Sequence, residues 1–104
     1  MATTTLSFTQ VGNEWQAEAT VTGDYNLHLE REGGGSLNIF QRATSSGQYM
    51  VCTGMPSWMN YNAGQVIDWA FGHGVYPEGG LHILIKSGSK VTSGTLSTAG
   101  EAGA

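Results

Sequence analysis

The segment Glu14–Glu32, with the sequence EWQAEATVTGDYNLHLERE, constrains the fold more than any other part of the chain. In its first half the apolar residues occupy every second position, at Trp15, Ala17, Ala19 and Val21. The second half repeats the alternation, with apolar residues at Tyr25, Leu27 and Leu29. Because the side chains of a strand alternate between two faces, each half predicts a strand with one buried face and one solvent-exposed face.

The link between these two strands decides how they are arranged. A two-residue turn would pair Val21 with Asn26 and would mix apolar and polar residues on one face. Pairing Val21 with Tyr25 keeps the apolar residues together and leaves Thr22–Asp24 as a three-residue loop. We therefore expect a three-residue hairpin. The alternative is an arch, in which the second strand crosses to an opposing sheet.

The rest of the chain repeats short alternating segments between polar or glycine-rich turns. We expect further strands at Leu6–Val11, Ser36–Ala43, Gln48–Thr53, Gln65–Phe71, Leu81–Lys86 and Lys90–Leu96. Gln65–Phe71 is apolar on both faces, which predicts a central strand or a strand covered by the preceding loop. About eight short strands and no significant helix predict an all-β fold. An antiparallel β-sandwich or jelly roll is expected, with a closed barrel as the second choice.

The length of 104 residues predicts one domain with a hydrophobic core of its own. We place this domain at residues 1–96, with Met1–Thr5 as a loose lead-in. Residues 97–104, STAGEAGA, lack large hydrophobic side chains and are expected to form a flexible C-terminal tail or to lie on a neighbouring subunit. Cys52 is the only cysteine, which excludes an intramolecular disulfide, and its strand-like surroundings predict a buried thiol.

The charge composition restricts the classes of partner. Only 12% of the residues are charged, and four basic against eight acidic residues give a net charge of −4. Without a basic patch, nucleic-acid binding is not expected. Met1–Leu6 does not resemble a signal peptide, and no apolar run is long enough to span a membrane. We expect the protein in the cytoplasm of the producing cell or inside a particle released by lysis, with no membrane partner.

Two irregular segments, Gly54–Gly64 and Gly72–Gly80, flank the strand expected at Gln65–Phe71. The aromatic residues of this region form a candidate binding surface, made of Trp58, Tyr61, Trp69 and Tyr76. Exposed rings of this kind stack on sugars or contact another subunit, whereas buried rings serve packing. Polar residues that could bind sugar hydroxyls lie nearby, at Asn60, Asn62, Asp68 and Glu78.

No pattern of catalytic or metal-binding residues stands out. Asp68, His73 and His82 lack the compact spacing of metal ligands, so no metal and no cofactor are expected. Gly33–Gly35 precedes a strand and has no lysine partner, which argues against a phosphate loop. No Gly-x-Ser-x-Gly sequence occurs, and Cys52 has no basic neighbour. We therefore expect no catalytic residues and no enzyme activity.

A separate turn signal precedes the strand expected at Leu81–Lys86. Pro77 fixes its own φ, and Gly79 and Gly80 tolerate positive φ. The sequence therefore predicts a sharp turn that directs the chain into this strand.

The chain as a whole resembles the small structural proteins of tailed bacteriophages and prophages. The resemblance lies in the start ATTTLSF, the alternating Glu14–Glu32 segment, the triple glycine and the ending YPEGGLHILIKSGSKVTSGTLS. It implies a non-enzymatic β-sandwich that decorates a head or sits in a tail or fibre, as a homo-oligomer or with other virion proteins. It carries over no single functional residue. The alternative function is a carbohydrate-binding module that binds glycans through the loop aromatics.

Overall fold

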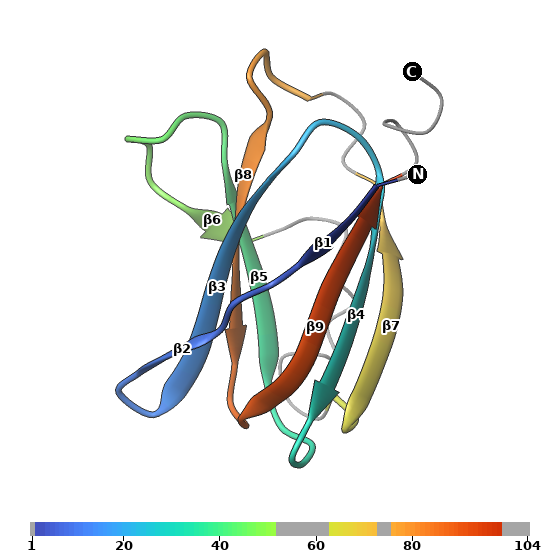
Figure 1. Ribbon diagram of the computed structural model, residues 1–104. Coiled ribbons are helices and arrows are strands. Elements are labelled where there is room, and N and C mark those ends of the chain that lie inside the picture. The colour runs from blue at the N-terminus through green and yellow to red at the C-terminus, as the bar shows by residue number, and fades with distance from the viewer. Residues whose placement is uncertain (1, 52–62, 73–75, 99–104) are drawn as a thin grey trace.

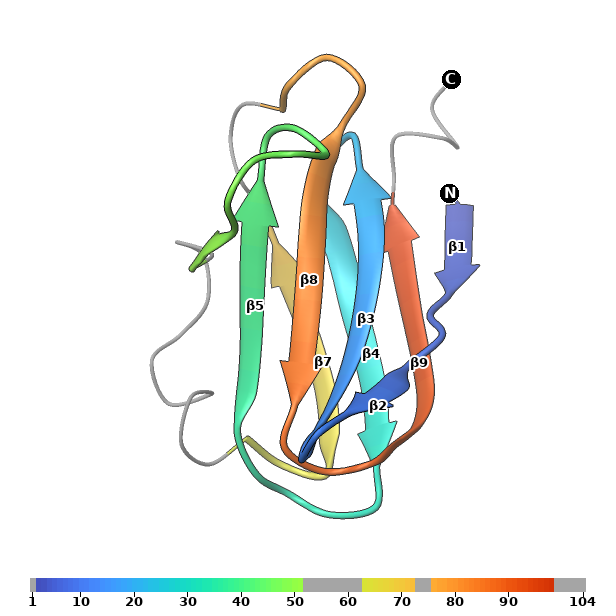
Figure 2. The ribbon, with the colours of Figure 1, turned by 90° about the vertical axis from the view of Figure 1, so that its left-hand side faces the viewer.

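The computed structural model describes residues 2–51, 63–72 and 76–98. In these ranges the chain forms strands and no helix (Figures 1 and 2). The strands are β1 Ala2–Thr5, β2 Thr9–Val11, β3 Glu14–Val21, β4 Tyr25–Arg31, β5 Leu37–Arg42, β6 Met50–Val51, β7 Val66–Phe71, β8 Leu81–Ser87 and β9 Val91–Thr98. They form two antiparallel sheets, a first sheet with the order β1-β9-β4-β7 and a second with the order β2-β3-β8-β5-β6. The predicted all-β sandwich is confirmed.

The strand pairs are nested within one another along the chain. The first strand pairs with the last, β1 with β9, and the pairing continues inward with β3 and β8, β4 and β7, and β5 and β6. This is the arrangement of a long hairpin rolled into two facing sheets, which defines a jelly roll. The remaining strand, β2, adds to the edge of the second sheet beside β3.

The hairpin expected between the two halves of Glu14–Glu32 is wrong, and the alternative, an arch between the two sheets, is right. β3 lies in the second sheet and β4 in the first, so Thr22–Asp24 crosses between the sheets. Val21 and Tyr25 are only 1% and 3% exposed because both face the space between the sheets. Alternation identifies which residues are buried, but it does not identify the strand that supplies the hydrogen bonds. An arch therefore satisfies the same pattern as a hairpin.

The core fills the space between the two sheets. Its members come from alternate positions of the central strands, and those with no exposed surface are Leu27, Leu29, Leu37, Ile39, Ile83 and Ile85. Full burial of each such side chain stabilises the fold by about 1.5–3 kcal/mol. The alternation expected from the sequence therefore accounts for the interior.

The chain crosses from the first sheet to the second between β1 and β2. Leu6 is buried at this crossing, and Phe8 packs against the core. Gly94 makes room for them, because a Cβ at this position would lie 3.0 Å from side-chain atoms of both Leu29 and Phe8. A strand residue with any side chain would push the crossing segment away.

Both ends of the domain differ from expectation. Ala2–Thr5 is not a loose lead-in but the strand β1. Ser97 and Thr98, which the sequence placed in the tail, end β9 and pair with Thr3 and Ala2. Backbone hydrogen bonds hold these residues in place although they lack large apolar side chains. The tail predicted for residues 99–104 lies outside the described residues.

Two strand predictions need correction or restriction. Val66–Phe71 is not central, since β7 forms an edge of the first sheet with Val66 59% exposed. Apolar residues on both faces do not distinguish a buried strand from an edge strand that carries exposed apolar side chains. Of the strand expected at Gln48–Thr53, only Met50–Val51 is formed in the described residues, and Cys52 lies outside them. None of the described residues belongs to a helix with the length and apolar character needed to cross a membrane.

Candidate functional site

The structure describes two members of the expected aromatic surface, and Trp58 and Tyr61 lie outside the described residues. Trp69 pairs with the fully buried Leu27, so it lies on the side of β7 that faces the second sheet, and it is 37% exposed. Tyr76 is half-buried against the core, and its hydroxyl donates a hydrogen bond to Asp24 Oδ1 at 2.8 Å. Trp69 thus lies at the sandwich edge and Tyr76 fixes a loop. The four-residue binding surface stays a prediction.

The structure also separates two residues considered as metal ligands. Asp68 lies on the outer face of the first sheet, where it contacts His28. His82 lies on the outer face of the second sheet, with Nδ1 3.3 Å from Thr20 Oγ1. The two side chains therefore do not share a site. The third residue of this set, His73, lies outside the described residues.

A polar cluster on the outer face of the first sheet is centred on His28. His28 Nε2 lies 3.1 Å from Glu30 Oε2 on the same strand, and Nδ1 lies 3.3 Å from Asp68 Oδ2 on β7. Asn26 donates a hydrogen bond to Asp68 Oδ1 at 2.8 Å. On the other side of β4, Thr95 of β9 stands opposite His28. The cluster links the edge strand β7 to the interior strand β4 by side-chain bonds.

The two carboxylates favour the protonated form of His28. The hydrogen bond to Glu30, followed by that to Asp68, raises the pKa of His28 above its ordinary value of 6.5. The hydrogen bonds from Asn26 and then from His28 lower the pKa of Asp68. His28 alternates with Leu27 and Leu29, so the sequence pattern predicts that it lies on the exposed face of its strand. The contact with Asp68 joins positions 40 residues apart and could not be read from the sequence.

We expect the contribution of His28 to stability to depend on pH. Because the folded chain holds the imidazole proton more tightly than the unfolded chain, this contribution is fully present below pH 6.5 and is lost as the pH rises through the folded-state pKa. Chemical unfolding between pH 5 and pH 9 measures it, with His28→Asn expected to remove this part of the pH dependence.

His82→Asn is the matched control, because His82 lies on the other sheet and contacts Thr20 instead of a carboxylate. The control keeps the contacts of His28 with Glu30 and Asp68, so the part of the pH dependence assigned to His28 should remain. If His28→Asn and wild type keep parallel stability curves over this range, the assigned role of the carboxylate contacts is wrong.

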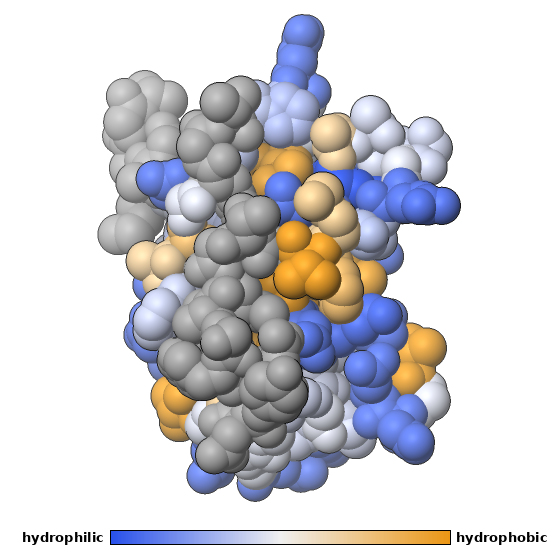
Figure 3. Space-filling model, turned by 180° about the vertical axis from the view of Figure 1, so that it is seen from behind, coloured by the Kyte–Doolittle hydropathy of each residue, from blue (hydrophilic) through white to orange (hydrophobic). Residues whose placement is uncertain are grey.

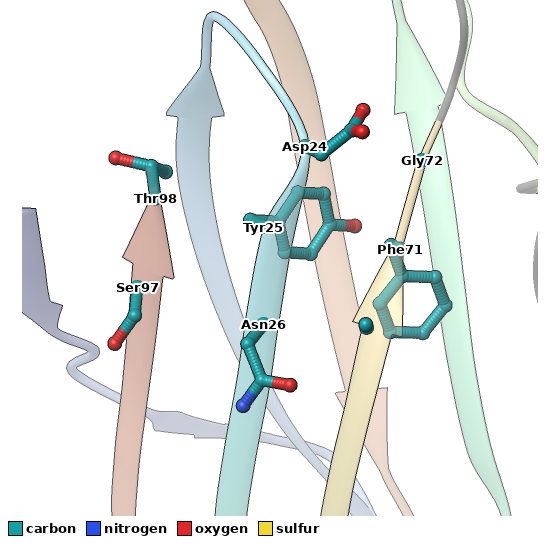
Figure 4. Close-up of a pocket in the computed structure, with 8 residues that line it drawn as sticks. Asp24, Tyr25, Asn26, Phe71, Gly72, Ser97 and Thr98 are labelled. Atoms are coloured by element: carbon teal, nitrogen blue, oxygen red, sulfur yellow. The ribbon is translucent and has the colours of Figure 1, made fainter. Parts of the chain in front are cut away.

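A groove of about 340 Å³ lies at the end of the first sheet where β9, β4 and β7 meet (Figure 4). Its lining residues are Asp24, Tyr25, Asn26, Ala70, Phe71, Gly72, Ser97 and Thr98. The rings of Tyr25 and Phe71 stack with their centroids 5.3 Å apart and are almost fully buried. The lining offers a carboxylate, an amide and three hydroxyls, groups that can hydrogen-bond a small polar ligand. None of the described residues that line it is a Cys, His or Lys.

Arg31 is a buried cation that sequence reasoning missed. It is 1% exposed, and burial lowers the pKa of its guanidinium below the ordinary value of an arginine. It donates hydrogen bonds to three segments, with acceptors at Gly35 O, Ser36 O, Ala63 O, Gly64 O and Ser87 Oγ. The sequence did indicate that Arg31 is buried, because it follows Tyr25, Leu27 and Leu29 at every second position of the same strand. Its partners are carbonyl and hydroxyl oxygens, so its role is to hold these segments together.

No protein-family model and no curated protein sequence matches this chain.

Proposed function

We propose that this chain is a non-enzymatic structural protein that assembles through its surface, as a head-decoration, tail or fibre component of a phage virion. The observation that supports this most is the position of the exposed large hydrophobic residues. Within the described ranges, every exposed large hydrophobic residue lies on an edge strand. These residues are Val11 of β2, Met50 and Val51 of β6, and Val66 and Trp69 of β7. The four aliphatic members are between 52% and 59% exposed.

This distribution favours lateral contacts between molecules. Seen from behind, the surface carries separate hydrophobic patches among hydrophilic residues (Figure 3). The interior is filled by side chains with no exposed surface, so the outer surface is what the fold offers to partners. Apolar side chains on edge strands suit contacts in which another chain covers both the side chains and the strand.

The virion assignment draws on the sequence resemblance and on the fold class. Jelly rolls build viral capsid domains, although they also build lectins and cupins, so the fold alone does not select a function. The genes that flank this one test the assignment. Capsid, portal or tail genes beside it would support a virion component, whereas genes for polysaccharide-degrading enzymes would favour sugar binding.

Assembly itself is tested by size-exclusion chromatography with light scattering. The chain has a mass of 11.0 kDa. We expect a mass above this value that grows with the loaded concentration, or co-elution with another virion protein. A strict monomer at high concentration that also binds no shell or tail component would contradict the proposal.

Sugar binding is the second candidate, and the groove beside Asp24 favours it. Its carboxylate, amide and hydroxyl groups match the hydroxyls of a sugar. A glycan array tests this candidate, with Asp24→Asn expected to weaken any signal. An array without a signal would end it.

A further inference from the structure

β1 forms an open edge of the first sheet, because within the described ranges it pairs with β9 alone. The N–H of Leu6 donates to Gly94 O at 2.9 Å, so Leu6 and Gly94 form a hydrogen-bonded pair. Hydrogen-bonded and non-hydrogen-bonded pairs alternate along an antiparallel ladder. Thr3 and Thr5 therefore stand in non-hydrogen-bonded pairs, and their backbone N–H and C=O groups point away from β9. The contact of 3.1 Å between Thr3 Oγ1 and Ser97 Oγ fits the closer approach in such a pair.

This edge lacks the protection that edge strands of natural proteins usually carry. Residues 1–13, which include β1 and β2, contain no charged residue and no proline. Thr3, Thr4 and Thr5 are exposed and β-branched, which suits them to a pleated sheet. Charges, prolines, bulges and very short strands normally prevent pairing at an edge.

The other edge strands are better protected than β1. β7 carries Asp68, β6 has two residues and β2 has three. β1 lies at the margin of the molecule beside β9 in Figure 2. It is therefore the edge best suited to receive another strand.

The charge of the chain indicates which molecule supplies the strand that pairs with β1. Two copies that each carry a net charge of −4 repel one another wherever their acidic surfaces meet. They can approach most closely through an uncharged edge. A charged peptide, in contrast, would find no opposite charge on residues 1–13. A second copy of the same chain fits the edge best.

We propose that β1 pairs antiparallel with β1 of a second copy, about a two-fold axis at Thr4. Thr3 then stands opposite Thr5 of the second copy, and each of the two symmetric pairs exchanges two backbone hydrogen bonds. The four-stranded first sheets of both copies become one continuous sheet. The interface rests on the proposed function, because it names the partner of that assembly.

The small size of this contact sets the strength of association. A pair of four-residue strands buries far less than the roughly 1,200 Å² of a standard interface. The free dimer should be weak and should form reversibly at high concentration. In a particle, neighbouring copies would be held at an effective concentration near the millimolar range, where the contact persists.

Sedimentation velocity with a proline variant tests the interface. Thr5→Pro deletes an N–H that points away from β9, and by symmetry it removes two of the four intermolecular bonds. The average mass of the wild type should rise between about 10 µM and 1 mM, and Thr5→Pro should need at least about tenfold more protein for the same mass. Thr5→Ala is the matched control, which keeps the N–H and should associate like the wild type. Equal association of Thr5→Pro and Thr5→Ala would contradict the interface.

Cross-linking provides a readout that does not depend on proline. In the proposed register, Thr4 meets Thr4 of the second copy with Cα atoms about 4.5 Å apart, which is within reach of a disulfide. In a Cys52→Ser background, oxidation of Thr4→Cys should give covalent dimers. Thr9→Cys, on β2 of the other sheet, serves as the control and should give few.

The outcomes separate this interface from the proposed function. Association that survives Thr5→Pro, together with no excess cross-link at Thr4→Cys, overturns the β1 interface and leaves surface assembly standing. A wild type that stays monomeric up to about 1 mM and gives no cross-link also overturns the interface. In that case the proposed function is contradicted as well if the chain also binds no other virion protein, and it stands if the chain does bind one.

Discussion

Replacing Arg31 by Met is expected to lower the free energy of unfolding by about 3 kcal/mol, a large part of the stability of a domain of this size. The change keeps an apolar stem of similar length and removes five hydrogen bonds. The carbonyls of Gly35, Ser36 and Ala63 each keep a backbone N–H partner. Ser87 Oγ likewise keeps its two hydrogen bonds with Ser89. The loss therefore falls mainly on Gly64 O, and relief from burying a cation offsets part of it.

Thermal and urea unfolding measure this effect. At roughly 4–8 °C per kcal/mol, the midpoint should fall by about 12–24 °C. Arg42→Met is the matched control, because Arg42 donates a hydrogen bond to Gly47 O at 3.1 Å and lies over the ring of Tyr49, away from the segments that Arg31 contacts. We expect Arg42→Met to lower the free energy of unfolding by about 1 kcal/mol or less. Similar losses for the two variants would show that Arg31 does not hold the three segments together.

The second large effect is expected at Gly80, at the end of the turn that precedes β8. Gly80 has φ +98°, and a Cβ there would lie 2.5 Å from Thr20 Cγ2 and 3.2 Å from Val21 O. Gly80→Ala should therefore lower the free energy of unfolding by about 3 kcal/mol, because it strains the backbone at positive φ and displaces the end of β3. Gly79 has φ +87° but no atom within 4 Å of such a Cβ. Gly79→Ala should cost about 1 kcal/mol, from strain alone.

The two alanine variants thus separate crowding from backbone strain. Adding Thr20→Ser to Gly80→Ala removes the closest methyl group and should restore part of the lost stability. Urea unfolding of the four proteins, including the wild type, gives the comparison. Equal losses for Gly79→Ala and Gly80→Ala, or no recovery with Thr20→Ser, would mean that packing against β3 does not constrain this turn.

Local sequence pattern predicted the buried face of most strands. Tyr25, Leu27 and Leu29 alternate with polar residues, and all three are buried as expected. The turn before β8 was also predicted, since Gly79 and Gly80 both adopt positive φ. These features depend on residues close together in the chain, so the sequence displays them directly.

Features that depend on distant residues could not be predicted in this way. β3 pairs with β8, which begins 60 residues beyond the end of β3. The alternation of apolar and polar residues in β3 is equally compatible with a hairpin between β3 and β4. The carbonyl partners of Arg31 and the contact of His28 with Asp68 likewise follow from strand order. The sequence pattern predicts a loose lead-in at Met1–Thr5, whereas backbone pairing with the distant β9 makes Ala2–Thr5 a strand.

The central claim is that the sandwich acts through its open edge, where β1 meets a second copy. Amide hydrogen exchange by NMR at about 20 µM and about 1 mM protein tests it most directly. The amides of Thr3 and Thr5 should exchange quickly in the dilute sample and at least about tenfold more slowly in the concentrated one. The amide of Leu6, bonded to Gly94 within one copy, should exchange alike in both. Equally fast exchange of Thr3 and Thr5 at the two concentrations would contradict the claim.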